Sequence, residues 1–278
     1  MQHPRDAMLP AVQEAGFLWR TTPEVSYLEP AVLHGRPRLR CAFTLRHAGT
    51  SGGALNLSVD RGQRAEVQAN RHRVLRALGL GHTSLYTVRQ VHGNQLCVVD
   101  EAAVQHGLHG IQADALITTL PEVSLGVLVA DCLPIVFYTL APPVLAVVHA
   151  GRMGTYHRIA SRVLDVLQER FAVAAEQVYA ILGPAIGACC YTLDARAVDP
   201  FREHFPDWEA FFRPCGVERW VMSLTAANTA QLHAAGVPAT HVHTAPLCTS
   251  CYNQHLYSHR AEGQEAGRGM AIAALLPG

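Results

Sequence analysis

Three residues that can bind a metal ion stand beside small residues in apolar parts of the sequence. His92 lies in RQVHG, Cys132 in VADCLP and His149 in VVHAG. Two imidazole nitrogens and one thiolate form a sound set of zinc ligands, and they leave a fourth position for water. Water bound at such a site can have its pKa lowered to about 7, which gives a nucleophile near neutral pH. The sequence therefore contains a candidate catalytic zinc site.

The spacing of these residues does not decide the matter, because they are 40 and 17 residues apart and form no compact zinc-finger pattern. The same pattern fits Cys132 as a small buried hydrophobe and the two histidines as caps of strands. On the pattern alone, this structural interpretation is favoured over a metal site. Because a thiol must lose its proton to bind zinc, a true site should lose its metal in acid.

Apolar blocks surround the three motifs, and each block has the composition of a β-strand. A strand whose last residue can bind metal would present that residue at the rim of a sheet, so we expect His92, Cys132 and His149 at three strand ends. We also expect strands in the remaining apolar blocks. The blocks are LRCAFTL, ALNLSV, SLYTVRQVHG, QLCVVD, ADALITT, VSLGVLVADCLPIVFYT, VLAVVHAG, the start of QVYAILGPAIGACC, and MAIAALL.

Helical spacing occurs over residues 64–80, with Gly79 as a stop, and over residues 156–171 and 224–235. Strands outnumber these helices and often follow one another directly, which favours an α+β fold with mixed β-sheets sandwiched with helices. Prolines punctuate residues 1–38, so we interpret them as a peripheral N-terminal segment. Residues 39–278 are then a single catalytic domain.

The composition limits the partners of the protein. Hydrophobic residues make up 49% of the chain and charged residues 16%, as in a well-packed globular protein. Lys plus Arg and Asp plus Glu both number 22, so no net charge attracts nucleic acid or a membrane surface. The N-terminus has no apolar run, and Asp131 and three prolines interrupt the most apolar stretch, residues 123–148. We expect a cytoplasmic protein with reduced thiols and a small-molecule substrate.

Read together, the blocks resemble the multicopper polyphenol oxidase or laccase-domain family, also called the peptidoglycan editing factor family. The metal ligands of that family are the His of QVHG, the Cys of ADCLP and the His of HAG, which match His92, Cys132 and His149. The resemblance implies the family's α+β sandwich of the YfiH-like type, unrelated to cupredoxin laccases. It covers residues 40–276 and rests on FTLRHAGTSGGALNLSV, ANRHRVLRALGL, RQVHG, ADALITT, LVADCLPIVFY, VVHAGRMGT, ILGPAIGACCY, LCTS, LYSHRAEG and GRGMAIAAL.

The resemblance also implies an activity. Members are similar to zinc-dependent purine nucleoside phosphorylases that act on adenosine, inosine, guanosine or methylthioadenosine and that deaminate adenosine. In deamination, zinc-activated water would attack C6 of adenine, and Asp131 is the nearest acid or base in sequence, although a strand-end role fits it better. Phosphorolysis needs a phosphate pocket, and the family motifs FTTR and SYR suggest Arg46 and Arg260.

Glycine-rich loops add candidate ligand contacts. The GPAIG loop, from Gly183 to Gly187, and HAGRMG would let backbone N–H groups approach a substrate or phosphate closely. The other interpretation of each loop is a tight turn that binds no ligand. Neither loop is a dinucleotide or ATP motif.

Other functions stay open at this point. Copper can occupy a Cys/His site, because Cu²⁺ exceeds Zn²⁺ in intrinsic affinity, but one His/Cys/His set cannot build the several copper sites of a multicopper oxidase. A polyphenol oxidase activity would then reflect metal loading. A peptidoglycan-precursor editing hydrolase would instead use Cys132 as a nucleophile with a histidine base. A non-catalytic metal-binding module is the third alternative.

Further cysteines and departures from the family pattern affect the details. We expect Cys248 to be structural or pocket-lining and Cys251 to be incidental, and we do not favour a second metal at Cys248, Cys251 and His255. The family's HAGWRG is HAGRMG here, so the Trp is lost and the Arg stands at Arg152. YSHRAE has His259 in place of Tyr, and CCYTL replaces the usual Phe-Glu after GPAIG. If the missing Trp stacks on the substrate base or the missing Arg binds phosphate, substrate choice would differ. The sequence indicates neither the preferred substrate, the physiological metal nor the oligomeric state.

Overall fold

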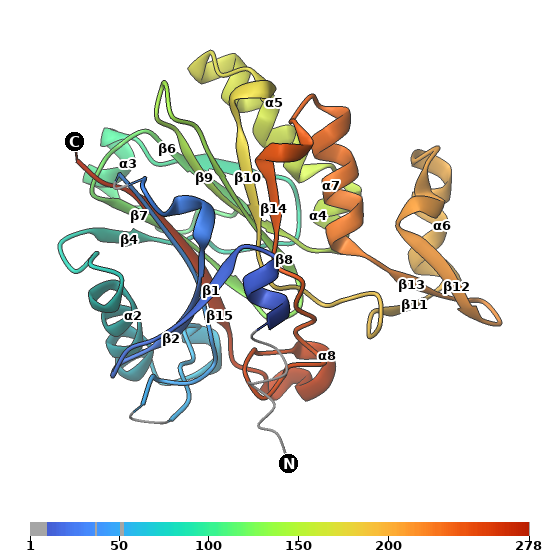
Figure 1. The fold of residues 1–278 in the computed structure, drawn as a ribbon, viewed down its shortest axis with the longest axis horizontal. Coiled ribbons are helices and arrows are strands. Elements are labelled where there is room, and N and C mark those ends of the chain that lie inside the picture. Colours follow the sequence, from blue (N-terminus) through green and yellow to red (C-terminus); the bar gives the residue numbers. More distant parts are fainter. Residues whose placement is uncertain (1–9, 37, 51–52, 278) are drawn as a thin grey trace.

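Two large β-sheets form the centre of the computed structural model, which describes residues 10–36, 38–50 and 53–277 (Figure 1). The first sheet has the strand order β1-β2-β3-β15-β7-β4. Its strands are β1 (Phe17–Thr21), β2 (Ser26–Pro30), β3 (Leu39–Thr44), β15 (Gly269–Leu275), β7 (Val123–Val129) and β4 (Ser84–Tyr86). The second sheet has the order β14-β10-β8-β9-β6-β5. Its strands are β14 (Val242–Thr244), β10 (Tyr179–Leu182), β8 (Leu133–Tyr138), β9 (Leu145–Ala150), β6 (Ala115–Thr118) and β5 (Leu96–Val98).

Each sheet contains both parallel and antiparallel pairs. Strands β4 and β7 are parallel in the first sheet, as are β10 with β14 and β5 with β6 in the second, and the other pairs are antiparallel. The two sheets face each other across a shared apolar core to which both contribute. Val136 and Val147 of the second sheet join Leu125 and Ala271 of the first in that core. The predicted α+β fold with mixed sheets is confirmed.

Helices cover the outer faces of the two sheets, so the molecule has four layers. Helix α2 (Arg64–Ala77) packs Val74 and Leu75 against Met270 and Ile272 of the first sheet. Helices α5 (Ile159–Phe171) and α7 (Leu224–Ala234) cover the second sheet on the opposite side (Figure 1). Strands β8 and β9 are therefore buried on both faces, which explains why their sequences are apolar at successive positions rather than at alternate ones.

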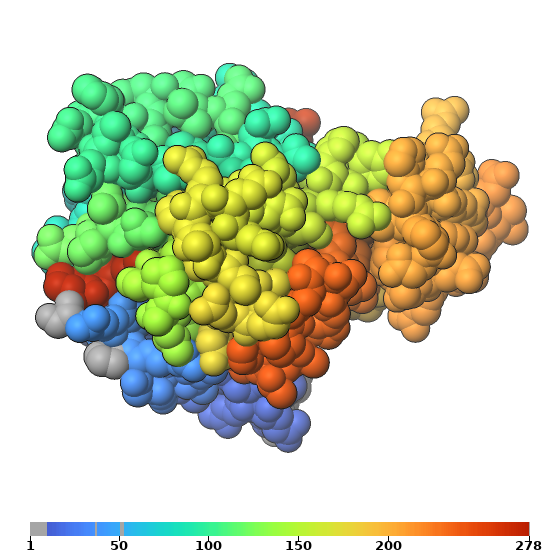
Figure 2. Space-filling view, turned by 90° about the horizontal axis from the view of Figure 1, so that it is seen from above, coloured from blue at the N-terminus to red at the C-terminus, as the bar shows by residue number. Residues whose placement is uncertain are grey.

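A smaller unit projects from this body. Strands β11 (Thr192–Asp194), β13 (Arg219–Met222) and β12 (Phe212–Gly216) form a three-stranded sheet that carries helix α6 (Ala195–His204). Figure 2 shows this unit as a lobe standing away from the rest of the surface. The remaining helices are α3 (Glu101–His106), α4 (Arg152–Tyr156) and α8 (His259–Glu262), and 3₁₀ turns occur at Ala31–Leu33, Val59–Arg61, Ala175–Gln177, Trp208–Ala210, Ala239–His241 and Gly263–Glu265. No helix among the described residues is long and apolar enough to cross a membrane.

Most expected elements are present, and some differ. The helix predicted over 64–80 ends at Ala77, before Gly79 with its φ of +72°, and the one predicted over 156–171 is divided between α4 and α5. The block ALNLSV is not a strand, although Leu55 and Leu57 are buried. Strand β4 covers only Ser84–Tyr86 of SLYTVRQVHG.

The N-terminal segment is partly structured. Strands β1 and β2 extend the first sheet at its edge, and Phe17 and Leu28 reach the core between the sheets. Residues 1–9 lie outside the described residues. The division at residue 38 stays a prediction.

Candidate metal centre

His92, Cys132 and His149 come together at one end of the two sheets, and one ligand atom of each lies within 4.8 Å of the others. His149 is the second-last residue of β9 and is 3% exposed. Cys132 follows β7 and precedes β8, where the chain passes from the first sheet to the second. The predicted single block around Cys132 is therefore two strands in different sheets. His92 is on the loop between β4 and β5 and not at a strand end, and its φ is +59°.

The strand register explains how the ligands meet. Leu133 pairs with Ala150 and Pro134 with His149, so Cys132 stands beside the end of β9. The rings of His92 and His149 meet edge to face with centroids 4.7 Å apart, and Cys132 Sγ lies 4.0 Å from His92 Nδ1.

Gly151 leaves the space in which the three side chains converge. A Cβ atom at this position would lie 2.9 Å from Cys132 Sγ and 3.2 Å from His92 Nδ1. A side chain here would therefore fill the space between the ligands. A soft thiolate, two imidazoles and this opening fit a zinc ion.

Asp114 is a further residue of this centre that sequence reasoning missed. Its fully buried carboxylate lies 2.8 Å from His149 Nδ1, which donates a hydrogen bond to it. The same carboxylate accepts backbone N–H groups of Gly93 at 2.7 Å and His92 at 3.0 Å. Asp114 thereby directs Nε2 of His149 toward the ligand cluster and holds the loop that carries His92. Its signal in the sequence is a lone acid at the start of the apolar block ADALITT.

The charges in the centre support ligation. Burial alone would raise the pKa of the Cys132 thiol, but the imidazoles of His149 and His92 lower it below its usual value. Burial alone would lower the pKa of His149, but the sulfur of Cys132 and the carboxylate of Asp114 raise it. Each group therefore favours the charged form of the other, and the thiolate is the form of Cys132 that binds metal.

A cavity of about 590 Å³ opens onto the three ligands. Its size is within the range of small-molecule sites. Apolar side chains, Leu128 and Ile186 among them, and the ring of Tyr191 form part of its wall. Four guanidinium groups also line it, those of Arg61, Arg89, Arg260 and Arg268. The arrangement can therefore take a molecule that has both a flat apolar part and an anionic part.

Comparison with known proteins agrees with this geometry. The family model described as multi-copper polyphenol oxidoreductase laccase matches residues 40–276. The chain belongs to this laccase-domain family. It is 33% identical over 240 residues to the purine nucleoside phosphorylase YlmD of Geobacillus stearothermophilus, covering 83% of this chain and 88% of that protein. It is also 33% identical over 199 residues to the adenosine deaminase RL5 of an unknown prokaryotic organism, covering 69% of this chain and 75% of that protein.

Solved structures of the laccase-domain family have the same fold. The crystal structure of YlmD from Geobacillus stearothermophilus superposes with a TM-score of 0.84 at 30% identity, covering 94% of this chain and all of that one. The Bacillus licheniformis protein YfiH gives a TM-score of 0.82 at 26% identity, covering 92% of this chain and 98% of that one. The predicted YfiH-like fold is confirmed.

Two predicted site residues of this laccase-domain chain line the cavity together. Asp131 is buried, and its carboxylate accepts hydrogen bonds at 2.6 Å from the Thr249 hydroxyl and at 2.6 Å from the backbone N–H of Arg260. The Arg260 guanidinium donates to the carbonyls of Cys190 and Thr192. Asp131 thus connects the metal centre to the segment that carries Arg260.

Three other predicted residues are absent from the part of the cavity wall that the structure describes. Arg46 forms an ion pair with Glu262 at 2.8 Å, and its guanidinium lies 4.8 Å from the centre of the Tyr257 ring. A Cβ atom at Gly183 would lie 2.3 Å from the ring of Phe43, so close packing requires glycine there. A Cβ atom at Gly187 would lie 3.2 Å from Cys248 Cβ. Of the GPAIG loop, Ile186 reaches the cavity.

The departures from the family motifs have distinct positions. Arg152 is on α4 and donates to the carbonyl of Ala197, away from the cavity wall. His259, in place of the usual Tyr, lines the cavity and contacts the carbonyl of Gly263 through Nδ1 at 2.7 Å. His259 and Tyr191, the latter in the CCYTL departure, are therefore the departures that line the cavity and have a direct route to substrate choice.

Cys251, which the sequence suggested to be incidental, lies in a cluster of cysteines that the sequence did not predict. Its sulfur lies 3.5 Å from that of Cys189 and 3.4 Å from that of Cys190, and Cys248 completes a second group of four potential metal ligands. His255 is not part of this group, and its ring packs against Trp19 with centroids 5.0 Å apart.

Proposed function

We propose that this protein is a zinc-dependent purine nucleoside phosphorylase that also deaminates adenosine. Adenosine, inosine, guanosine and methylthioadenosine are its proposed nucleoside substrates, and we propose that it acts in the cytoplasm, where its thiols stay reduced. The supporting observation is that the His92, Cys132 and His149 cluster faces a cavity lined by arginines. Two relatives that carry these activities in their names add support.

The three side chains would hold the zinc ion, and the protein orients them. The bound ion would supply a Lewis acid and a water molecule with a pKa near 7. Asp114 accepts the proton of His149 Nδ1 in a hydrogen bond, so that Nε2 carries the lone pair. Gly151 keeps the space between the ligands open.

In deamination, water adds to C6 of the purine and ammonia leaves. The apolar wall around Leu128 and Ile186 would take the purine ring, since flat apolar groups gain from leaving water. The polar atoms of the nucleoside would face the ligand cluster. The base would then have its reactive carbon close to His92 and Cys132.

In phosphorolysis, a phosphate oxygen attacks C1′ of the ribose and the purine leaves. Planar guanidinium groups bind phosphate through paired hydrogen bonds. Arg89 is the best placed to do so, because its side chain makes no hydrogen bond or ion pair within the described residues. The guanidinium of Arg268 already donates to the carbonyls of Ala266 and Gly267, and that of Arg260 donates to two other carbonyls. These two would present a fixed positive charge.

Asp131 has a positioning role in this proposal. Both of its carboxylate oxygens accept hydrogen bonds from the protein, one from Thr249 and one from Arg260. It would therefore hold the cavity wall in place rather than transfer a proton.

Product analysis by mass spectrometry tests the proposal. Purified protein is incubated with adenosine, inosine or methylthioadenosine, with and without phosphate. We expect inosine from adenosine in both conditions. Free base should form only when phosphate is present, together with ribose 1-phosphate from adenosine or inosine and 5-methylthioribose 1-phosphate from methylthioadenosine. The Cys132→Ala variant should lose both activities, whereas Cys215→Ala, which changes an exposed thiol outside both cysteine clusters, should keep them.

Other outcomes would support the alternatives. Normal adenosine turnover by Cys132→Ala would contradict the metal-centre model. Release of an amino acid from a muropeptide by metal-free protein would favour the editing hydrolase with Cys132 as nucleophile. Oxidation of a phenol only after copper loading would identify that activity as a property of the copper-substituted site.

A further inference from the structure

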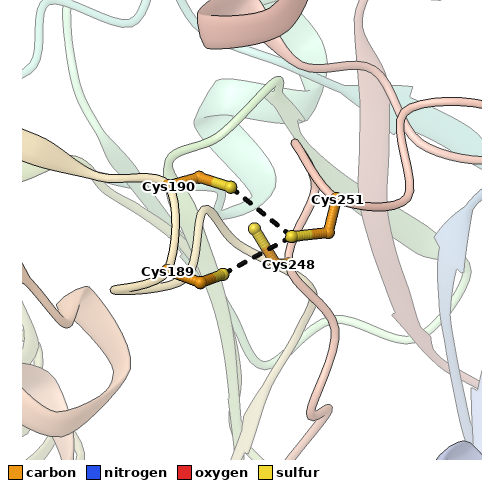
Figure 3. Close-up of side chains that lie close together, drawn as sticks. All are labelled: Cys189, Cys190, Cys248 and Cys251. Carbon is orange, nitrogen blue, oxygen red and sulfur yellow. Dashed lines mark hydrogen bonds between the residues drawn. The ribbon is translucent and has the colours of Figure 1, made fainter.

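Four cysteines from two distant parts of the chain meet at the surface beside the cavity. Cys189 and Cys190 are in the loop after β10, and Cys248 and Cys251 are in the loop after β14. Figure 3 shows the four side chains turned toward one another, with the sulfur of Cys251 joined by dashed lines to those of Cys189 and Cys190. All four sulfurs lie within 4.8 Å of one another. Cys248 is buried, Cys190 is half-buried, and Cys189 and Cys251 are exposed.

We propose that these four cysteines form a second, structural zinc site, distinct from the centre at His92, Cys132 and His149. A tetrahedral zinc ion with bonds of about 2.3 Å to sulfur separates its ligand sulfurs by about 3.8 Å. Two of the sulfur–sulfur distances here, 3.4 Å and 3.5 Å, are near that separation. Four thiolates would complete the shell and leave no open position, which is typical of structural sites.

The local backbone supports binding by the sulfurs. The N–H of Gly187 donates to Cys248 Sγ at 3.2 Å, so this sulfur already accepts a hydrogen bond that favours a thiolate. Gly187 itself faces the cluster, where a Cβ atom would lie 3.1 Å from Cys189 Sγ. Glycine at this position therefore leaves room for the sulfurs to converge. Binding of zinc would release the protons of the thiols to solvent.

A single metal ion explains the arrangement better than disulfides or an iron–sulfur cluster. Disulfide sulfurs are about 2.05 Å apart, and all four cysteines are free. Cys251 is almost equally distant from Cys189 and Cys190, so a disulfide with either one would leave the other unexplained. A cluster of several iron atoms needs its cysteines farther apart, because sulfide ions lie between them. Soft sulfur ligands in a tetrahedral set favour zinc.

The proposed site would join two loops that form the cavity wall. The first loop carries Ile186 and Tyr191, and the second leads into His259 and Arg260, all of which line the cavity. The loops already touch, since the N–H of Thr249 donates to the carbonyl of Ala185. The Arg260 guanidinium donates to the carbonyl of Cys190 at 2.9 Å. Zinc would therefore order this side of the cavity while taking no part in the chemistry.

Counting zinc in the purified full-length chain tests the proposal without any nucleoside. We expect about two zinc ions per chain in the wild type and about one in the double variant Cys189→Ser/Cys251→Ser. Both positions are exposed, so the serine hydroxyl groups can hydrogen-bond to water. Cys132→Ala should also lose one ion, the one held by His92, Cys132 and His149, and should keep the ion held by the four cysteines. Cys215→Ser is the matched control and should keep both, because this exposed cysteine lies outside both clusters.

Absorption spectra of the cobalt-substituted protein give a second measurement, in which Cys132→Ala leaves the four-cysteine cluster unchanged. Metal-free Cys132→Ala protein should still bind one Co²⁺ ion with strong thiolate-to-cobalt charge-transfer absorption from four thiolates. The double variant should bind one Co²⁺ ion with the weaker absorption of a single thiolate. Equal zinc content in the wild type and the double variant, or no cobalt binding by Cys132→Ala, would overturn the proposal. Mapping of a disulfide from Cys251 to Cys189 or Cys190 in metal-free native protein that cannot be reloaded would also overturn it.

Discussion

The carboxylate of Asp114 lies 2.8 Å from Nδ1 of His149, and it also accepts the N–H groups of the loop that carries His92. One buried side chain therefore orients a ligand on a strand and a ligand on a loop. Carboxylate–histidine pairs of this kind set the tautomer of the ligand and raise its basicity. Asp114 therefore holds two of the three candidate ligands in their positions.

Replacement of Asp114 by Asn should weaken zinc binding by about 10- to 100-fold, because the amide is a poorer acceptor for the His149 N–H. Competition with a chelator of known affinity measures the effect. Asp194→Asn is the matched control, since Asp194 caps α6, belongs to neither ligand cluster and should leave zinc affinity unchanged. An unchanged affinity in Asp114→Asn would remove Asp114 from the metal centre.

Asp114 should also make the stability of the metal-free protein depend on pH. Burial opposes its ionisation, but hydrogen bonds with His149, Gly93 and Val91 outweigh burial and lower its pKa. A carboxyl group whose pKa is lower in the folded state stabilises the protein above its unfolded-state pKa, about 3.9, and that contribution is lost as the pH falls through the folded value. The wild type should therefore exceed Asp114→Asn in free energy of unfolding at pH 6, and the difference should shrink in acid. Urea unfolding of both proteins across pH, after removal of metal, provides the measurement, and a constant difference would contradict this origin.

Gly151 offers a test of the space between the ligands. In Gly151→Ala the new methyl group would lie 2.9 Å from Cys132 Sγ, so the ligands must move apart. The φ of Gly151 is −76°, which any residue can adopt, so the backbone itself should not be strained. We expect loss of most bound zinc with little loss of secondary structure, read by metal analysis and circular dichroism. Gly81→Ala is the control, because the nearest atom to its added Cβ would be at 3.5 Å.

The convergence of the three candidate ligands was predictable from the sequence, because each of them has a short motif around it. His92, Cys132 and His149 stand in RQVHG, VADCLP and VVHAG, and the family's pattern carries them to this chain. Their elements were less predictable. The chain around Cys132 reads as one apolar block, yet it divides between two sheets, since apolar runs do not reveal where a chain changes layers.

The partners of these ligands could not be read from spacing. Asp114 is 35 residues from His149, and its role depends on the antiparallel pairing of β6 with β9. Cys189 and Cys251 are 62 residues apart, and Cys251 looked incidental because one CxxC pair is a weak signal. Arg46 fitted a phosphate role by motif, but Glu262, 216 residues away, is its partner. In each case the contact lies between residues that are distant in sequence, so spacing alone gives no signal of it.

Variants of two arginines, Arg46 and Arg89, can distinguish a residue that supports the fold from one that binds phosphate. Arg46 pairs with Glu262, both side chains are only about one-fifth exposed, and the Arg46 guanidinium also donates to the carbonyl of Asn253. Arg46→Ala should therefore lower the free energy of unfolding by about 1–3 kcal/mol. The Michaelis constant of the Arg46→Ala variant for phosphate should equal that of the wild type. Arg89→Ala removes an arginine that lines the cavity, and with it the proposed hydrogen bond to phosphate. Loss of a charged hydrogen bond costs about 1.5–3 kcal/mol, which corresponds to a Michaelis constant for phosphate that is about 10- to 100-fold higher. Deamination of adenosine, which consumes no phosphate, should be nearly unaffected in Arg89→Ala. Steady-state kinetics of both reactions in both variants is the measurement, and a phosphate defect in Arg46→Ala without one in Arg89→Ala would reverse the assignment.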